Sequence, residues 1–138
     1  MDALLSRLQA ESPGAMTVRK QTGPSELAPS WFVDPLDTSA SPLWIIGASW
    51  SDATVGFGRS SGRIELWQMG KTTAAEAADH LGQICQGVIA GGLTEWRQDE
   101  RACRYELRLP SGEVYSGRSN TLLRRRWKAV ERLSPYAL

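Results

Sequence analysis

A chain of 138 residues with a formal net charge of +1 and 41% hydrophobic residues has the size and composition of one globular domain. Its near-zero charge disfavours a general attraction to polyanions or to membrane surfaces. The longest apolar run, residues 43–48, is too short to cross a bilayer, and the first residues lack the apolar core of a signal peptide. We therefore expect a cytoplasmic protein with no membrane contact.

The N-terminal part of the chain is predicted to be a short helix followed by a leader. Residues 2–10 can form a helix with three leucines on one side. Residues 12–42 hold five of the seven prolines, a composition typical of a loop or linker. An island of three large apolar residues, 31–33, interrupts them, and we expect it to dock on the domain or on a partner. The predicted organisation is a helix and Pro-rich leader at residues 1–42 and a single α+β domain at residues 43–138.

Three strands are predicted next, at residues 43–50, 53–59 and 63–69, because each is a short apolar segment bounded by Ser, Asp or Gly turn residues. Both alternating sets of residues in the first segment are largely apolar, which suits a strand buried on two faces. Alternation along that strand places Trp44 and Ile46 on the same face.

The clearest single element is a helix between Thr72 and Gly92. Its apolar residues recur at spacings of three and four, which places them on one face. Thr73 and Glu76 have the spacing of a capping box at its start, and Gly91 with Gly92 can end it. The apolar stripe is wide enough to need a sheet or another helix over it.

Three more strands and a last helix complete the predicted order. The strands are residues 93–97, 102–109 and 113–117, and the helix is residues 121–133 with Asn120 as its cap. The order is helix, three strands, helix, three strands, helix. We predict an α+β fold: an antiparallel sheet of about five to six strands with the central helix packed on one face, in two layers.

Little in the chain points to catalysis or to metal binding. His80 is the only histidine, and we expect it in solvent because it lies off the apolar stripe of its helix. Cys85 and Cys103 lack metal-ligand spacing and are expected to be buried apolar residues; whether they pair is left open. We therefore expect no catalytic residue, no cofactor and no metal.

A carboxylate-based enzyme is the least favoured hypothesis. Glu65, Glu95, Glu106 and Glu113 all fall on predicted strands, where cross-strand pairing with arginines is the ordinary explanation. An enzyme that uses two carboxylates would need one of them in an apolar pocket.

The strongest charged feature is the basic face of the predicted last helix. The residues that share this face are Arg124, Arg125, Lys128 and Arg132. Such a face can bind phosphates, so nucleic acid is the alternative partner. A Gly-x-Ser sequence before a basic helix loosely resembles the end of a double-stranded-RNA-binding domain. The resemblance covers under a third of the chain and places the basic residues at other offsets, so it implies no role for any residue here.

Aromatic residues on the predicted strands are the second unusual feature. Several lie on a face that the central helix does not cover, where they are buried by the leader and the terminal helices or offered to a partner. Trp, Tyr and Arg dominate interface energetics, and contiguous exposed apolar surface is rarely idle. The residues expected to bind a partner are Trp31, Phe32, Trp44, Trp50, Trp67 and Met69.

Our first functional hypothesis is a small intracellular protein-binding module that acts through this aromatic sheet face. Adaptors, secretion chaperones and toxin-neutralising immunity proteins of bacteria are of this kind, and the element order is similar to that of secretion chaperones. We expect the partner to be another protein or a second copy of this chain.

Overall fold

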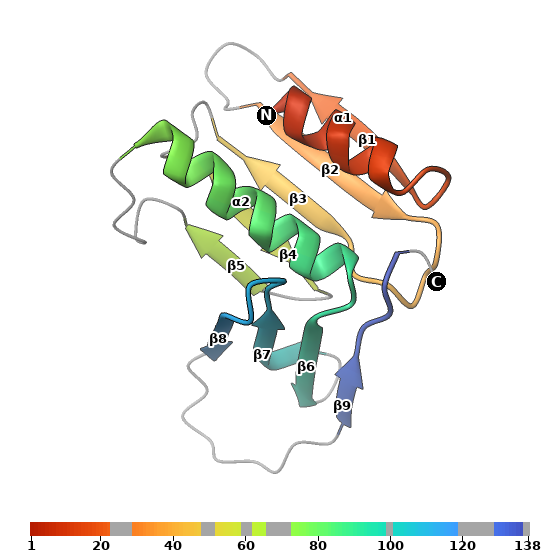
Figure 1. Ribbon diagram of the computed structural model, residues 1–138. Coiled ribbons are helices and arrows are strands. Elements are labelled where there is room, and N and C mark those ends of the chain that lie inside the picture. Colours follow the sequence, from red (N-terminus) through yellow and green to blue (C-terminus); the bar gives the residue numbers. More distant parts are fainter. Residues whose placement is uncertain are drawn as a thin grey trace.

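The computed structural model describes residues 1–22, 29–47, 52–58, 62–65, 73–98, 101–118 and 129–136. Within these ranges the chain forms two helices and two antiparallel sheets, so the predicted α+β class is confirmed (Figure 1). None of the helices in these ranges is long and apolar enough to cross a membrane.

Five consecutive strands form the first sheet, in the order of the chain. They are β1 (Met16–Gln21), β2 (Ser30–Pro35), β3 (Leu43–Ile46), β4 (Thr54–Phe57) and β5 (Gly62–Glu65). Four strands form the second sheet in the order β8-β7-β6-β9. They are β6 (Leu93–Gln98), β7 (Arg101–Arg108), β8 (Val114–Arg118) and β9 (Ala129–Arg132). The helices are α1 (Asp2–Glu11) and α2 (Ala74–Ile89).

The prediction of loop or linker structure for residues 12–42 was wrong, because β1 and β2 lie in this segment. The two strands pair with each other, and β2 pairs with β3, so the boundary predicted at residue 42 falls inside the sheet. Pro29 directly precedes β2 and Pro35 is its last residue. Proline is tolerated at strand ends, where no ladder hydrogen bond is lost, so these prolines limit the strand without preventing it.

The prediction of a helix through residue 133 was also wrong at its end, where the chain forms β9. Residues Thr94–Arg97 of β6 pair with β9 in antiparallel register, so tertiary pairing overrides local helix propensity here. The first part of the predicted helix, residues 121–128, lies outside the described residues. A single sheet was predicted as well, whereas the strands before and after α2 belong to separate sheets.

Helix α2 begins and ends as its sequence predicts. The Thr73 hydroxyl accepts a hydrogen bond from the backbone N–H of Glu76 at 3.1 Å, which confirms the N-cap. Gly91 has a φ of 78°, and the N–H of Gly92 donates to the carbonyl of Gly87 at 2.8 Å. A left-handed residue followed by this hydrogen bond is the common way to end a helix.

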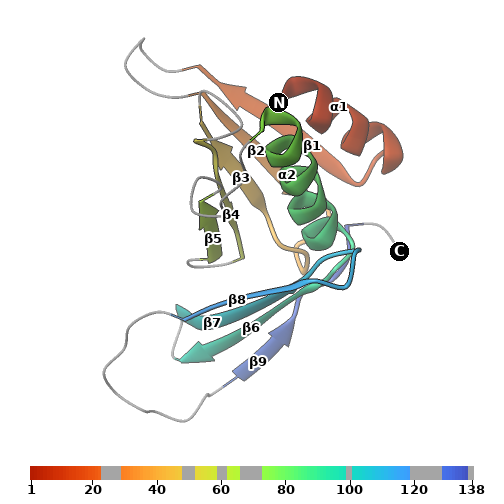
Figure 2. The same cartoon turned by 60° about the vertical axis from the view of Figure 1, so that its left-hand side comes forward.

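The core lies between α2, α1 and the inner faces of both sheets. Leu81, Ile84 and Val88 of α2 are buried in one apolar cluster with residues of both sheets. From the first sheet the cluster includes Trp31, Val33, Leu43, Ile45, Val55, Phe57 and Ile64; from the second it includes Leu93 and Leu107. Figures 1 and 2 show both described helices on the same side of the first sheet. That side is the inner face of this sheet.

The second sheet packs against the C-terminal half of α2 and the end of β4. A Cβ atom at Gly87 would lie 3.0 Å from the carbonyl oxygen of Arg108, so the backbone of α2 packs closely against the backbone of β7 at this point. The rings of Phe57 and Tyr105 meet edge to face with centroids 5.0 Å apart. The Tyr136 hydroxyl donates to the Ser41 carbonyl at 2.5 Å, which ties the end of the chain to the loop between β2 and β3.

Helix α1 is held to the first sheet by a polar contact as well as by its leucines. The Trp31 indole donates to the Asp2 carboxylate at 2.7 Å, and Lys20 donates to the same carboxylate at 3.0 Å. The hydrogen bond from Trp31, followed by that from Lys20, lowers the pKa of Asp2 below its ordinary value of 3.8.

The substitution Trp31→Phe should raise the pKa of Asp2 toward 3.8, because it removes the indole donor and keeps an aromatic ring. A carboxyl group with a depressed folded-state pKa stabilises the fold above its unfolded-state pKa, and that contribution is lost as pH falls through the folded-state value. The variant should therefore lose less of its stability in that acid range than the wild type does.

Carboxyl-carbon NMR titration measures this shift. Asp37 serves as an internal control, because Ser39 lowers its pKa independently of Trp31. An unchanged Asp2 pKa in the variant would contradict the contact.

Candidate functional site

The outer face of the first sheet, which turns away from both described helices, carries a row of residues in register across all five strands. The row runs Arg19, Phe32, Trp44, Gly56 and Arg63. Neighbouring strands lie about 4.8 Å apart, so the row is roughly 19 Å wide. We call this surface the aromatic face.

Phe32 and Trp44 are directly opposite each other at the centre of the aromatic face, and both are partly exposed. The Trp44 ring lies flat over Gly56: a Cβ atom there would fall within 2.0 Å of two of its ring carbons. Only glycine leaves room for the indole at this position. On the other side, the guanidinium of Arg19 lies over the Phe32 ring, 5.2 Å from its centroid. Ile46, on the same face as Trp44, is 40% exposed.

Charge on the aromatic face is balanced among its described residues. Arg19 pairs with Asp34 at 3.0 Å, and Arg63 pairs with Glu65 at 3.6 Å. Both arginines keep more than half of their side-chain surface exposed, at 57% and 65%. The sheet therefore offers an apolar centre with a rim of both charges.

Trp31 requires a correction, because the residue is 5% exposed and lies in the core rather than on a partner-binding surface. It alternates with Phe32 along β2, so it points to the inner face, where Asp2 binds its indole. Phe32 and Trp44 are the two predicted partner-binding aromatics that the structure brings together. Trp50, Trp67 and Met69 lie outside the described residues.

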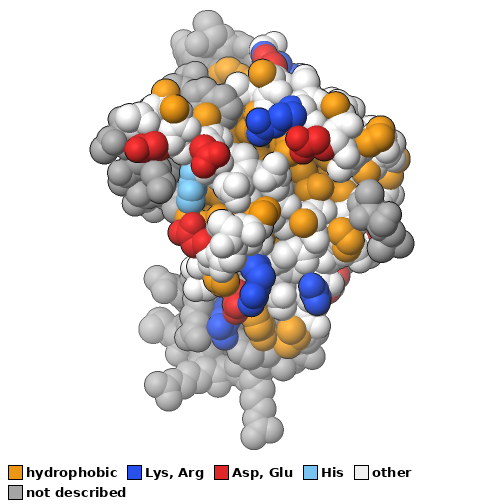
Figure 3. All heavy atoms as spheres, viewed as in Figure 1, with side chains coloured by type: hydrophobic (Ala, Val, Ile, Leu, Met, Phe, Trp, Pro, Cys, Tyr) orange, Lys and Arg blue, Asp and Glu red, His pale blue; other side chains and the backbone are white. Residues whose placement is uncertain are grey.

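A second surface, which we call the basic face, is the outer face of the second sheet. Register places Arg104 opposite Trp96, and Glu106 opposite Thr94. The Arg104 guanidinium lies 4.5 Å from the centroid of the Trp96 ring and 3.7 Å from a Glu106 carboxylate oxygen. Basic side chains, drawn in blue, gather over this sheet in the lower half of Figure 3, and among its described residues they are all arginines.

Arg132 is the one predicted nucleic-acid contact among the described residues, and it lies on strand β9 instead of a helix. Pairing of β9 with β6 puts Arg132 opposite Thr94 on the basic face. Arg124, Arg125 and Lys128 lie outside the described residues. No sequence signal marks Arg108 as part of a site, since its proximity to Arg132 depends on the pairing of β9 with β6.

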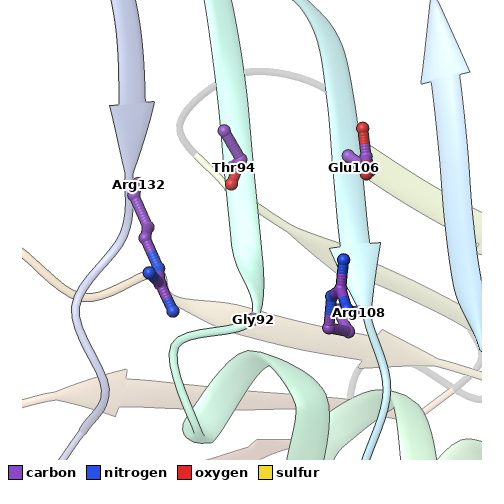
Figure 4. Close-up of a pocket in the computed structure, with 5 residues that line it drawn as sticks. All are labelled: Gly92, Thr94, Glu106, Arg108 and Arg132. Carbon is purple, nitrogen blue, oxygen red and sulfur yellow. The ribbon is translucent and has the colours of Figure 1, made fainter. Parts of the chain in front are cut away.

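A cavity of about 400 Å³ lies in the basic face. It is lined by Gly92, Thr94, Glu106, Arg108 and Arg132. Figure 4 shows Arg132 and Arg108 on either side of Gly92, with Thr94 and Glu106 further along the strands. In the part of the chain that the structure describes, neither Arg108 nor Arg132 forms an ion pair, whereas Glu106 is paired with Arg104. The cavity therefore has a cationic end.

His80 is buried, at 7% exposure, so the expectation that it lies in solvent was wrong. The second sheet packs on this side of α2, where His80 Nε2 is 2.5 Å from the hydroxyl of Tyr115. That hydroxyl donates to Glu113 at 3.0 Å. Burial and the Glu113 carboxylate raise the pKa of Tyr115, which keeps the phenol protonated and suits it to join β8 and the turn before it to helix α2 by hydrogen bonds.

The remaining groups that could take part in chemistry, the Cys85 thiol and the Glu95 carboxylate, are both buried. Burial raises the pKa of the free Cys85 thiol to about 12, so it is inert. Glu95 is the buried member of the four strand glutamates, at 1% exposure, and its carboxylate lies against the backbone of Gly58. Within the described residues, no group of three or more His, Cys, Asp or Glu could hold a metal ion.

One motif escaped the sequence analysis: residues 58–62 read Gly-Arg-Ser-Ser-Gly, the spacing of a hydrolase nucleophile elbow. That elbow needs a strand followed by a helix. Here residues 58–62 join β4 to β5, which pair in antiparallel register in the first sheet. The topology therefore does not give this motif the context that its chemistry needs.

Comparisons with protein-family models, with curated proteins and with solved structures found no match to this chain.

The two tryptophans of opposite faces should differ in what they contribute to stability. Trp31→Ala should lower the free energy of unfolding by about 3 to 5 kcal/mol, because it empties a core site. Trp44→Ala removes a partly exposed ring and should cost about 1 to 2 kcal/mol. Urea unfolding of both variants measures the difference, and equal losses would contradict the assignment of Trp44 to an open face.

Proposed function

We propose that this protein is a small protein-binding module and that its partner docks on the aromatic face. The observation that carries the proposal is the pairing of Phe32 with Trp44 at the centre of a sheet whose described helices both lie on the other side (Figure 2). Burying a partly exposed aromatic centre of this kind is favourable when a partner excludes water from it.

Rigidity favours the aromatic face as a binding surface. The Trp44 ring is fixed by the space above Gly56, and Phe32 is fixed between Trp44 and Arg19. Side chains that are already ordered lose little conformational entropy on binding. Trp and Arg are also the residues that most often dominate interface energetics.

Charge balance favours a protein as the partner. The two ion pairs on the aromatic face leave no net charge among its described residues, so phosphate-rich ligands gain nothing there. A protein surface with an apolar centre and a rim of both charges is complementary to it, since Arg19 and Asp34 can each exchange their partner for one across the interface.

The proposed role is that of an adaptor, a secretion chaperone or a toxin-neutralising immunity protein in the cytoplasm of a bacterium. The partner is a different protein or a second copy of this chain. A reducing compartment is in keeping with the free thiol of Cys85. The proposal assigns no catalytic step to this chain.

The test is affinity capture from the native cell with three forms of the full chain. They are the wild type, the aromatic-face variant Phe32→Ser/Trp44→Ser, and the control Val130→Ser, which removes an apolar side chain that is 61% exposed on the second sheet. We expect a partner whose affinity, measured with purified proteins, falls at least about tenfold with the aromatic-face variant and is unchanged with the control.

Sedimentation of the same three forms covers self-association. A wild-type dimer that the aromatic-face variant dissociates would support the proposal with a second copy as partner. The proposal fails if the wild type is a monomer and captures no protein that depends on Phe32 and Trp44.

A further inference from the structure

We propose that the basic face binds the phosphate group of a nucleotide in the cavity between Arg108 and Arg132. This site is separate from the aromatic face, and the inference does not depend on the proposed protein partner.

The cationic end suits a phosphate. Arg108 and Arg132 come from two strands that are not neighbours in the sheet, and both line the same cavity with no ion-pair partner among the described residues. Guanidinium groups bind phosphate oxygens through paired N–H donors, and such charge-assisted hydrogen bonds are the strong ones. The Thr94 hydroxyl lines the cavity between the two strands and adds another donor.

Net charge on the basic face points the same way. Arg104, Arg108 and Arg132 face one carboxylate, that of Glu106, so three positive charges and one negative charge leave two positive charges among these side chains. The described residues of the aromatic face, by comparison, carry no net charge. Of the two outer faces, only this one attracts a ligand with the charge of a phosphate group.

The middle of the cavity suits a sugar. Glu106 lines it next to Thr94 and presents an acceptor carboxylate, which an anion would avoid and a hydroxyl donor would use. A volume of about 400 Å³ is too large for a lone phosphate and fits a small organic ligand.

The next pair along the strands supplies flat surfaces for a base. Trp96 follows Thr94 on the same face of β6, about 6.8 Å further on, because residues two apart on a strand share a face. Arg104 is stacked on the Trp96 ring at 4.5 Å. Nucleobases stack on aromatic rings and on guanidinium planes, so the order cation pair, acceptor, planar stack matches phosphate, sugar, base.

Such a ligand has two sources with the same chemistry, a free nucleotide and a single-stranded nucleic acid. The test titrates the full chain at low salt with inorganic phosphate, with each of the four nucleoside monophosphates and with a mixed-sequence single-stranded oligonucleotide. We expect a nucleotide or the oligonucleotide to bind by calorimetry. Arg108→Gln/Arg132→Gln should weaken that binding by about tenfold or more, the loss expected for charge-assisted hydrogen bonds.

A charge-matched control is Arg19→Gln/Arg63→Gln, which removes two arginines from the aromatic face and should leave binding unchanged. All four substituted side chains are exposed or partly exposed, and circular dichroism checks that both variants keep the fold. Arg108→Lys/Arg132→Lys should retain part of the affinity, because lysine keeps the charge without the paired donors.

The relative affinities of the mononucleotide and the oligonucleotide, and the salt dependence of binding, distinguish the two sources. A mononucleotide that binds as tightly as the oligonucleotide indicates a free nucleotide as the ligand. Tighter binding of the oligonucleotide with a steep salt dependence indicates a strand. The inference is overturned if none of the nucleotides or the oligonucleotide binds, or if the control variant loses as much affinity as Arg108→Gln/Arg132→Gln.

Discussion

Burial of one apolar helix against two sheets is the constraint on which the rest of the structure depends. Leu81, Ile84 and Val88 of α2 lie in a cluster that contains residues of both inner faces. At Gly87 the backbone of α2 packs closely against the backbone of β7. The apolar stripe of α2 is wide, so one side of the stripe can pack on the first sheet and the other side on the second sheet.

This arrangement determines which sheet faces lie outside the core that the described residues form. Each sheet turns one face to the shared core and the other away from it, so two outer faces remain. They differ in charge: Arg19 and Arg63 are paired on the aromatic face, whereas Arg108 and Arg132 form no ion pair within the described part of the basic face. The two proposals, a protein on one face and a phosphate on the other, follow from that difference.

Local signals in the sequence predicted the elements that local physics controls. The cap at Thr73 and the end of α2 at Gly91 depend on neighbouring backbone groups, and both are confirmed. The prediction that Trp44 and Ile45 point to opposite faces of the sheet is confirmed for the same reason, since side-chain direction in a strand has a period of two.

Features that depend on distant pairing could not be predicted. Strand β1 has one buried residue, Met16, and a largely exposed remainder, so no apolar alternation announces it. Strand β9 exists because β6 offers an edge, and only that pairing places Arg132 beside Arg108. Trp31 points into the core because it lies on strand β2. Because the sequence predicted a linker in this segment, strand alternation could not be used to predict which side chains face the core.

The most direct test of the account compares three aromatic rings on one sheet by hydroxyl-radical footprinting, at a concentration where the protein is monomeric. The account predicts that Trp44 and Phe32 are oxidised readily and that Trp31, at 5% exposure, is protected. Equal protection of Trp44 and Trp31 in the monomer would contradict it, because the first sheet would then have no open face.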